Sequence, residues 1–283
     1  MAIKIITDSA SDISQKEAEQ LGIIMVPLQV RFDQEEFFDG VTLSKTEFYE
    51  KLIECDTLPQ TSQITPYRFE EAFKKATAEG DEVLAVLLSS KLSGTYQSAV
   101  TAAEKFDGKV AVIDSLSAAV GERLLVMIAL DLVKQGKTIA EIVNELNIKK
   151  QKLRILAMLN TLEYLKKGGR ISSSVAMAGK LLSIKPVVAL VDGEVKLLGK
   201  AMGSKNAKNL LNSLIEKTGG IDFDLPLGTI WSGLNDIVLK KYIEDSAHLW
   251  QEHREKVPAY CIGCTIGTHV GPNAVGVAFF SKN

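Results

Sequence analysis

The chain has 283 residues, of which 46% are hydrophobic and 24% charged, and its formal net charge is −2. This composition is typical of a folded globular protein and excludes intrinsic disorder and collagen-like repeats. Charges of both signs are interleaved, and no run of lysine or arginine is long enough to follow a nucleic-acid backbone, so we expect no nucleic-acid partner. A chain of this length is expected to form two domains.

The amino-terminal segment does not resemble an export signal. The strand-like run Ile3–Ile6 reaches Asp8 too soon for the apolar core of a signal peptide. The uncharged segment 257–281 has the length of a membrane span, but its glycines, prolines and hydroxyl residues predict buried strands and a turn. Three cysteines are few and odd in number, which suits a reducing compartment. We therefore expect a cytoplasmic protein with no integral membrane segment.

In the first half, short apolar strands alternate with amphipathic helices. The expected strands or extended segments are Ile3–Ile6, Ile23–Phe32, Val83–Leu88 and Val110–Ile113, and the expected helices are Ser14–Gln20, Lys45–Ile53, Pro66–Ala78, Gly94–Phe106 and Ser117–Lys134. A further helix carries Ile139, Ile142, Val143 and Leu146 on one face. This alternation predicts a Rossmann-like α/β domain with a parallel sheet over residues 1–152.

The pattern changes near residues 150–153, where a second α/β domain is expected to begin and to cover 153–283. Its expected strands are Arg154–Leu159, Val187–Val191, Val195–Leu198, Leu227–Trp231, Ala259–Ile266 and Ala274–Phe280. Its expected helices are Leu162–Lys167, Val175–Leu182, one that carries Ala207 and Leu214, and Asp236–Trp250. Asp192-Gly193 between two strands favours a two-residue hairpin, which predicts a mixed or antiparallel sheet.

Hydroxyl-rich turns follow three strands of the first domain, at residues 7–12, 89–95 and 114–115. Ligands of open α/β sheets bind beyond the carboxyl ends of the strands, so these donors are expected to face one crevice. For any single residue in these turns, capping of the next helix is a sufficient explanation.

Ser93-Gly94 is the most specific of these features. The glycine lets a ligand approach the backbone, and the helix that begins there points free amide groups at Ser93, so an anion is expected to bind. Thr61 and Ser62 form a second group of donors, which a helix cap at Thr65 does not explain. The alternative is that both are ordinary turn residues.

His269 lies between two expected strands and is flanked by glycines. A neutral imidazole there could donate to a carboxylate or act as a base, or it could be a histidine satisfied inside the domain. Cys261 and Cys264 have the spacing of a redox pair or half a zinc site, but no second pair exists and the strand-like context favours a structural role. We expect no metal site.

Five motifs together resemble the DegV family of bacterial fatty-acid-binding proteins. They are TDSASD at 7–12, TSQIT at 61–65, SSKLSGTYQSA at 89–99, LEYLKKGGRIS at 162–172 and IGTHVGP at 266–272, and the likeness covers essentially the whole chain. The resemblance implies a carrier protein with no catalytic residues and no cofactor. Its ligand would be a long-chain fatty acid, which many members of the family present to an ATP-dependent fatty-acid kinase.

The resemblance also implies roles for individual residues. Thr61 and Ser93 would bind the carboxylate, with Ser62 and Gly94 adjacent and His269 completing the polar network, while the second domain encloses the acyl chain. Apart from the resemblance, Arg170 follows glycines that end one helix, and we expect it to pair across the domain junction and support the site. Some kinase-coupled members carry an arginine in the loop after the hairpin, where this chain has Lys200, the candidate for contact with the kinase. Asn273 replaces the usual small residue after THVGP and is expected to affect local turn geometry.

Two other functions stay open at this point. A serine hydrolase could use Ser93 and His269 with Asp8 or Asp114 as the orienting acid, although the sequence lacks a nucleophile elbow. An enzyme acting on a phosphorylated ligand could use the helix terminus at Ser93, although no cluster of lysine and arginine lies nearby in the sequence.

Overall fold

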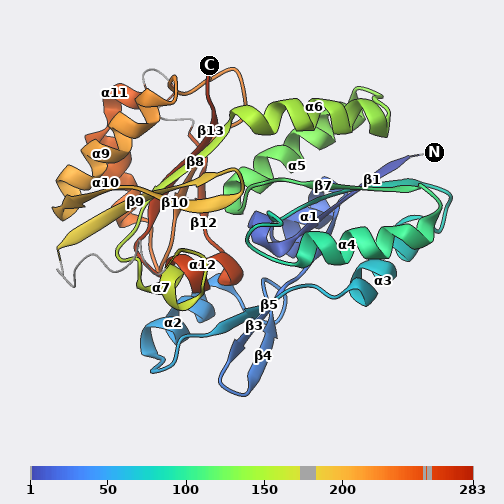
Figure 1. The fold of residues 1–283 in the computed structure, drawn as a ribbon, viewed down its shortest axis with the longest axis horizontal. Coiled ribbons are helices and arrows are strands. Elements are labelled where there is room, and N and C mark those ends of the chain that lie inside the picture. Colours follow the sequence, from blue (N-terminus) through green and yellow to red (C-terminus); the bar gives the residue numbers. More distant parts are fainter. Residues whose placement is uncertain (1, 173–182, 251–252, 254–256, 283) are drawn as a thin grey trace.

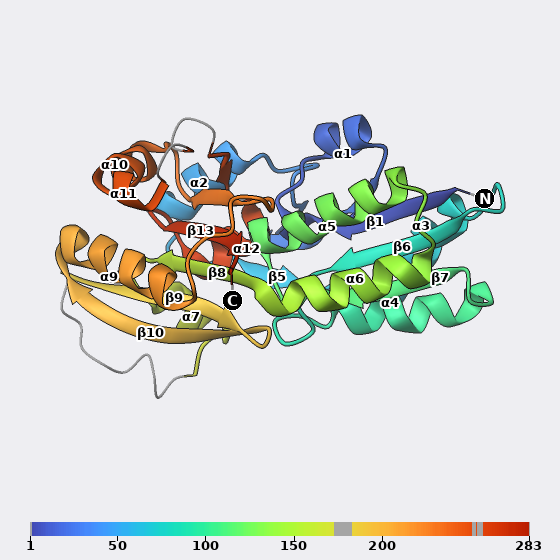
Figure 2. The same cartoon turned by 90° about the horizontal axis from the view of Figure 1, so that it is seen from above.

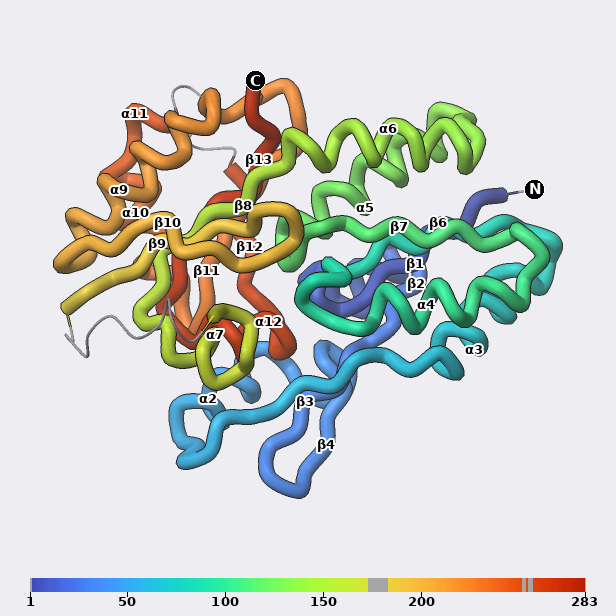
Figure 3. Tube along the Cα trace, viewed as in Figure 1, coloured from blue at the N-terminus to red at the C-terminus, as the bar shows by residue number. Residues whose placement is uncertain are grey.

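The computed structural model describes residues 2–172, 183–250, 253 and 257–282. The helix expected at Val175–Leu182 lies outside the described residues. Figure 1 shows two sheets with their helices side by side, and the same path can be followed as a tube in Figure 3. No helix among the described residues is long and apolar enough to cross a membrane.

The first sheet is fully parallel and has the strand order β2-β1-β6-β7. Its strands are β1 Ile3–Asp8, β2 Ile24–Val26, β6 Glu82–Leu87 and β7 Val110–Asp114. The helices that cover it are α1 Gln15–Leu21, α3 Pro66–Ala76, α4 Thr95–Ala103, α5 Ala119–Lys134 and α6 Ile139–Lys152, with short turns η1 Ser9–Ser11 and η2 Glu104–Phe106. These elements agree with the sequence prediction.

Alternation of side chains along the strands explains why both faces are covered. Ile5 and Leu84 pack under α1, α5 and α6, whereas Ile6 and Val83 pack against α3 and α4. Figure 1 shows α5 and α6 on one side of this sheet and α3 and α4 on the other. Since both faces are buried, most positions of these strands are apolar, as is typical of parallel sheets, and β1 is the exception with Lys4, Thr7 and Asp8.

The second sheet is mixed and has the order β10-β9-β8-β13-β11-β12, in which only β11 and β12 pair in parallel. Its strands are β8 Leu153–Met158, β9 Ile184–Val191, β10 Glu194–Met202, β11 Gly228–Trp231, β12 Ala259–Cys261 and β13 Val275–Phe280. The hairpin turn has Asp192 at φ +50° and Gly193 at φ +82°, which is the predicted geometry. One face packs against α9 Gly203–Lys217, α10 Ile237–Asp245 and α11 Ala247–Trp250, and the other faces α5 (Figure 2).

A third, three-stranded antiparallel sheet was not predicted. It consists of β3 Gln29–Phe32, β4 Glu35–Phe38 and β5 Gln60–Ser62 in the order β4-β3-β5, and α2 Lys45–Glu54 packs beside it. The extended segment expected at 23–32 is therefore divided into β2 and β3, which belong to different sheets. β5 is only three residues long and polar, so its pairing with β3 leaves no hydrophobic pattern in the sequence.

The strand expected over Ala259–Ile266 was wrong in its second half, because β12 ends at Cys261 and helix α12 runs over Cys264–Val270. Carboxylates from the first half of the chain hold the start of this helix. Asp39 accepts hydrogen bonds from the amides of Cys264 and Thr265, both at 3.0 Å, and Asp12 accepts from the amide of Gly263. Negative charge at a helix N-terminus is favourable, so these contacts support a helix in an apolar run.

Candidate ligand-binding site

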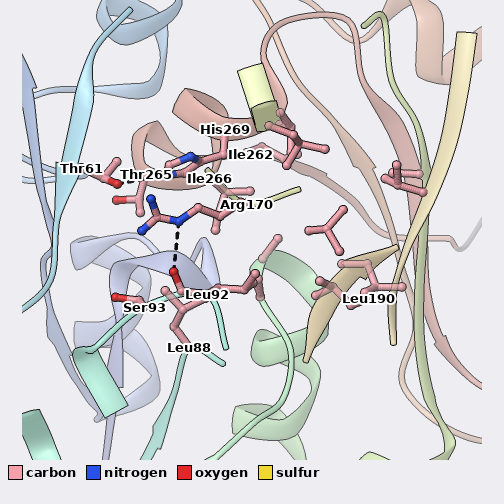
Figure 4. A pocket seen from close by; sticks show the side chains of 18 of the residues that line it. Thr61, Leu88, Leu92, Ser93, Arg170, Leu190, Ile262, Thr265, Ile266 and His269 are labelled. Atoms are coloured by element: carbon pink, nitrogen blue, oxygen red, sulfur yellow. Dashed lines mark hydrogen bonds between the residues drawn. The ribbon is translucent and has the colours of Figure 1, made fainter. Parts of the chain in front are cut away.

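A cavity lies where the first sheet, the second sheet and α12 meet. Its volume is about 260 Å³. Most of the lining is apolar and comes from both halves of the chain, including Leu88, Leu92 and Ala118 from the first half and Ile155, Val188, Leu190 and Val195 from the second. In Figure 4 the labelled polar side chains lie together on one side of the cavity, and Leu190 lies on the opposite side.

At this polar end, Thr61 from β5 meets His269 from α12. Thr61 Oγ1 and His269 Nε2 are 2.9 Å apart, although the two residues are 208 positions apart in the chain. β5 is fixed by its pairing with β3, where Thr61 lies opposite Val30. His269 was expected between two strands, but it projects from the last turn of α12 because the segment is helical.

His269 is neutral at physiological pH. Burial, and to a smaller extent the nearby positive charge of Arg170, together lower the pKa of its imidazole to about 4. Its other ring nitrogen, Nδ1, is buried and has no hydrogen-bond partner among the described residues. The ring fits beside α7, Glu163–Lys167, because Gly168 has no side chain: a Cβ there would lie 2.2 Å from Nδ1.

Ser93 is tied to the start of α4. The amide of Thr95 donates to Ser93 Oγ at 3.2 Å, and Ser93 Oγ lies 3.0 Å from Thr95 Oγ1. This is a local turn contact and not a helix cap, because the N-cap of α4 is Gly94 and no side chain caps the helix. Ser93 also lines the cavity. Gly94 also lines the cavity, and the room left by its missing side chain is filled by Gln63, since a Cβ would lie 2.0 Å from Gln63 Oε1.

Arg170 joins the two halves of the chain beside the cavity. Its Nε donates to the carbonyl of Leu92 at 3.1 Å, and its Nη1 donates to the carbonyl of Gly168 at 2.6 Å. Ser62, on β5, also lines the cavity. Lys200 does not: it lies on β10 opposite Pro186, and not in a loop after the hairpin as expected.

Of the three hydroxyl-rich turns, only the one that contains Ser93 reaches the cavity. Ser9, after β1, donates to Asp39 at 3.2 Å, and Ser115, after β7, donates to the carbonyl of Ser117 at 3.1 Å. Neither residue lines the cavity. The prediction that all three strand ends face one crevice was therefore wrong, and local hydrogen bonding accounts for the other two turns.

Thr265 was missed by the sequence interpretation. It lines the cavity from α12, one helical turn before His269, and Figure 4 shows it beside Thr61 and His269. Its hydroxyl is buried and has no hydrogen-bond partner among the described residues. The four-residue spacing of Thr265 and His269 puts them on one face of a helix, but that spacing has meaning only once the segment is known to be helical.

The geometry does not support a serine hydrolase. Ser93 Oγ is bonded to Thr95 and not to His269, whose Nδ1 has no carboxylate partner among the described residues. The two candidate acids are occupied elsewhere. Asp8 accepts from the amides of Ala10 and Leu88, and Asp114 accepts from the amides of Ser90 and Leu116. This chemistry needs a nucleophile that is hydrogen-bonded to a base, which is hydrogen-bonded in turn to an acid, and the described residues do not form such a chain.

The two neighbouring cysteines have the environment of structural residues. Cys264 is buried at the first position of α12, and Cys261 lies at the end of β12. Burial raises the pKa of both thiols, that of Cys261 to about 11, so little reactive thiolate is present near neutral pH. No group of three histidine, cysteine, aspartate or glutamate side chains suited to a metal ion is found in the described part of the chain.

Comparisons with known proteins match this architecture over its full length. The family profile described as "Uncharacterised protein, DegV family" matches residues 2–282. A DegV domain-containing protein of Caldanaerobacter subterraneus is 36% identical over 288 residues, covering 99% of both chains. Two solved structures are also similar. A fatty-acid-binding DegV family protein of Thermus thermophilus has a TM-score of 0.88 and 30% identity, with 99% of this chain and 100% of that one covered. DegV of Bacillus subtilis, a fatty-acid-binding protein, has a TM-score of 0.82 and 29% identity, with both chains fully covered.

Proposed function

The chain belongs to the DegV family, and from this premise we propose that it is a carrier that binds a long-chain fatty acid in the cavity. The carboxylate would lie among Thr61, Ser62, Ser93, Gly94 and His269, with Arg170 in support. The observation that carries the proposal is an apolar cavity with hydroxyl groups, an imidazole and one guanidinium gathered at one end. The similar proteins of Thermus thermophilus and Bacillus subtilis are fatty-acid-binding proteins, which supports the same ligand class.

The apolar lining would supply most of the binding free energy. Each methylene group moved from water into an apolar environment contributes about 0.8 kcal/mol, so a sixteen-carbon tail contributes roughly 11–12 kcal/mol before the costs of association and ordering. The head-group contacts would chiefly fix the position of the carboxylate.

The hydroxyl of Ser93 is well prepared to donate. Its oxygen accepts from the Thr95 amide and can accept from the Thr95 hydroxyl, which occupies both lone pairs and leaves its own proton for the ligand. A neutral His269, hydrogen-bonded to Thr61, would orient the Thr61 hydroxyl toward the carboxylate without adding charge to the site. Arg170 would supply the positive charge, since it is the charged residue in the described lining.

In the same proposal the carrier presents its ligand to an ATP-dependent fatty-acid kinase. A carboxylate oxygen would attack the γ-phosphorus of ATP, the bond to ADP would break, and an acyl phosphate would form. Lys200 on β10 is the proposed contact with the kinase. We also propose a cytoplasmic location, which is supported by the ATP requirement of the kinase and by three cysteines that form no disulfide among the described residues.

The proposal also divides the chain into two domains, residues 1–152 with the carboxylate-binding loops and residues 153–283, which enclose much of the acyl chain. The division is supported by the two larger sheets. The last strand of the parallel sheet ends at Asp114, and the first strand of the mixed sheet begins at Leu153.

The ligand class can be tested directly. Purified protein is denatured and extracted with organic solvent, and the extract is analysed by mass spectrometry. We expect about one fatty acid per chain. A nucleotide or a phosphorylated metabolite in its place would contradict the proposal, as would an empty protein that fails to bind added radiolabelled palmitate.

The kinase step needs a separate test. Lys200→Glu should slow acyl-phosphate formation by the cognate kinase and leave palmitate affinity unchanged, because Lys200 is not among the lining residues. Lys196→Glu on the same strand is the matched control. Equal rates for the wild type and Lys200→Glu would show that the kinase binds elsewhere.

A further inference from the structure

Thr265 carries a buried hydroxyl that the protein itself does not satisfy. Thr265 is 3% exposed, and its Oγ1 has no hydrogen-bond partner among the described residues. It nevertheless lines the cavity, and in Figure 4 its side chain lies beside those of Thr61 and His269. Buried hydroxyl groups are normally hydrogen-bonded, so this one requires an explanation.

The position of Thr265 in α12 explains why no internal partner is available. A threonine in a helix usually donates to the carbonyl four residues earlier, as Thr268 does to Cys264 at 2.9 Å. For Thr265 the corresponding residue is Cys261, which lies in β12 before the helix begins. The carbonyl of Cys261 instead accepts from Lys45 Nζ at 2.6 Å.

Thr265 is also held firmly in place. Its amide donates to Asp39 Oδ2 at 3.0 Å, and Asp39 is itself buried. Thr265 and His269 are four residues apart on one helix and therefore share a face, which is the face that lines the cavity. The Thr265 hydroxyl is therefore a donor without a partner, fixed at the polar end of the cavity, where an oxygen of the ligand can accept its hydrogen bond.

We propose that Thr265 donates a hydrogen bond to the ligand's head group and makes the site selective for an ionised carboxylate. The inference rests on the proposed function. An ionised carboxylate has two oxygens with about four acceptor positions, enough for Thr61, Ser93 and Thr265 together. A primary alcohol has one oxygen with two acceptor positions, which Thr61 and Ser93 alone can fill.

The test compares Thr265→Val, which keeps the shape and removes the hydroxyl, with Thr265→Ser, which keeps the hydroxyl. Dissociation constants are measured for palmitate and for hexadecanol. We expect Thr265→Val to weaken palmitate binding about tenfold or more, since hydrogen bonds to charged groups are the stronger ones. Hexadecanol affinity should change less than about twofold, and Thr265→Ser should restore most of the palmitate affinity.

A second readout separates this role from a structural one. Palmitate labelled with ¹³C at the carboxyl carbon is titrated in the bound state by NMR. Loss of a donor to the charged form raises the pKa of a carboxyl group, so the bound ligand should titrate at higher pH in Thr265→Val than in the wild type. The ligand-free Thr265→Val protein should also unfold at a higher urea concentration, because an unsatisfied buried hydroxyl has been removed.

The control is Thr268→Val, whose hydroxyl is bonded within the same helix. It should lower stability and leave the ratio of palmitate to hexadecanol affinity unchanged. The inference is overturned if Thr265→Val keeps both that ratio and the titration of the bound carboxyl. If the wild type binds no palmitate, the proposed function has failed, whereas dependence on Ser93 but not on Thr265 means that only this inference has failed.

Discussion

Gly168 lies where the imidazole of His269 leaves no room for a side chain. A Cβ at this position would lie 2.2 Å from His269 Nδ1 and 2.9 Å from Cε1. The backbone of Gly168 has φ −74° and ψ −6°, which any residue adopts, so Gly168→Ala introduces no backbone strain. The substitution should therefore act on the histidine ring, which has to move by more than 1 Å to reach ordinary contact distance.

Such a displacement would break the 2.9 Å hydrogen bond between His269 and Thr61. Leaving a buried donor or acceptor unsatisfied costs about 1–3 kcal/mol, which corresponds to roughly five- to 150-fold in affinity. Replacing glycine by alanine also restricts the unfolded chain and stabilises the fold by about 0.4–1 kcal/mol. Because this hydrogen bond also stabilises the ligand-free protein, we expect palmitate affinity to fall and the free energy of unfolding to fall as well, by up to about 2.6 kcal/mol once the gain from the restricted unfolded chain is subtracted.

A double-mutant cycle with His269→Ala is the appropriate assay, with palmitate dissociation constants measured for all four proteins. Gly168→Ala should weaken binding in the wild-type background and have no further effect when His269 is alanine, because the clashing ring is then gone. Equal losses in the two backgrounds, or no loss in the wild type, would refute the reasoning.

Three further results are expected. Ser93→Ala should weaken palmitate binding about ten- to a hundredfold and leave the gain of about 0.8 kcal/mol per methylene across a chain-length series unchanged; a flattened series would contradict a purely head-group role. The pKa of His269 in the folded protein, about 4, is below its ordinary value of 6.5, so the unfolded chain binds a proton first as the pH falls. The contribution of neutral His269 to the free energy of unfolding is therefore fully present above pH 6.5 and is lost as the pH falls from 6.5 to 4. Urea unfolding should show this loss, about 3 kcal/mol, in the wild type and not in His269→Gln, and parallel pH profiles would argue against it. Asp39→Asn removes one of two acceptors at the start of α12 and should cost about 1–3 kcal/mol by urea unfolding, whereas a change within experimental error would mean that the helix start is held otherwise.

Much of the fold follows from local patterns in the sequence. Apolar strands that alternate with helices of one apolar face determine the parallel sheet, and Asp192-Gly193 determines the hairpin between β9 and β10. The start of α4 was also recognisable, because Ser93-Gly94 is a local signal for a helix that begins at the next residue. These features depend on residues a few positions apart, so a single sequence contains the information.

The tertiary structure decided the rest, because the partners concerned are far apart in the chain. The sequence pattern predicted a strand over Ala259–Ile266, but α12 begins at Cys264, where Asp39, more than 220 residues earlier, accepts from the first amides of the helix. Once that segment is helical, His269 turns toward Thr61 and the hydroxyl of Thr265 loses its internal acceptor. Side chains on one face recur every 3.6 residues in a helix and every two residues in a strand. The residues that face the cavity could therefore be identified only after long-range contacts had decided that this segment is a helix.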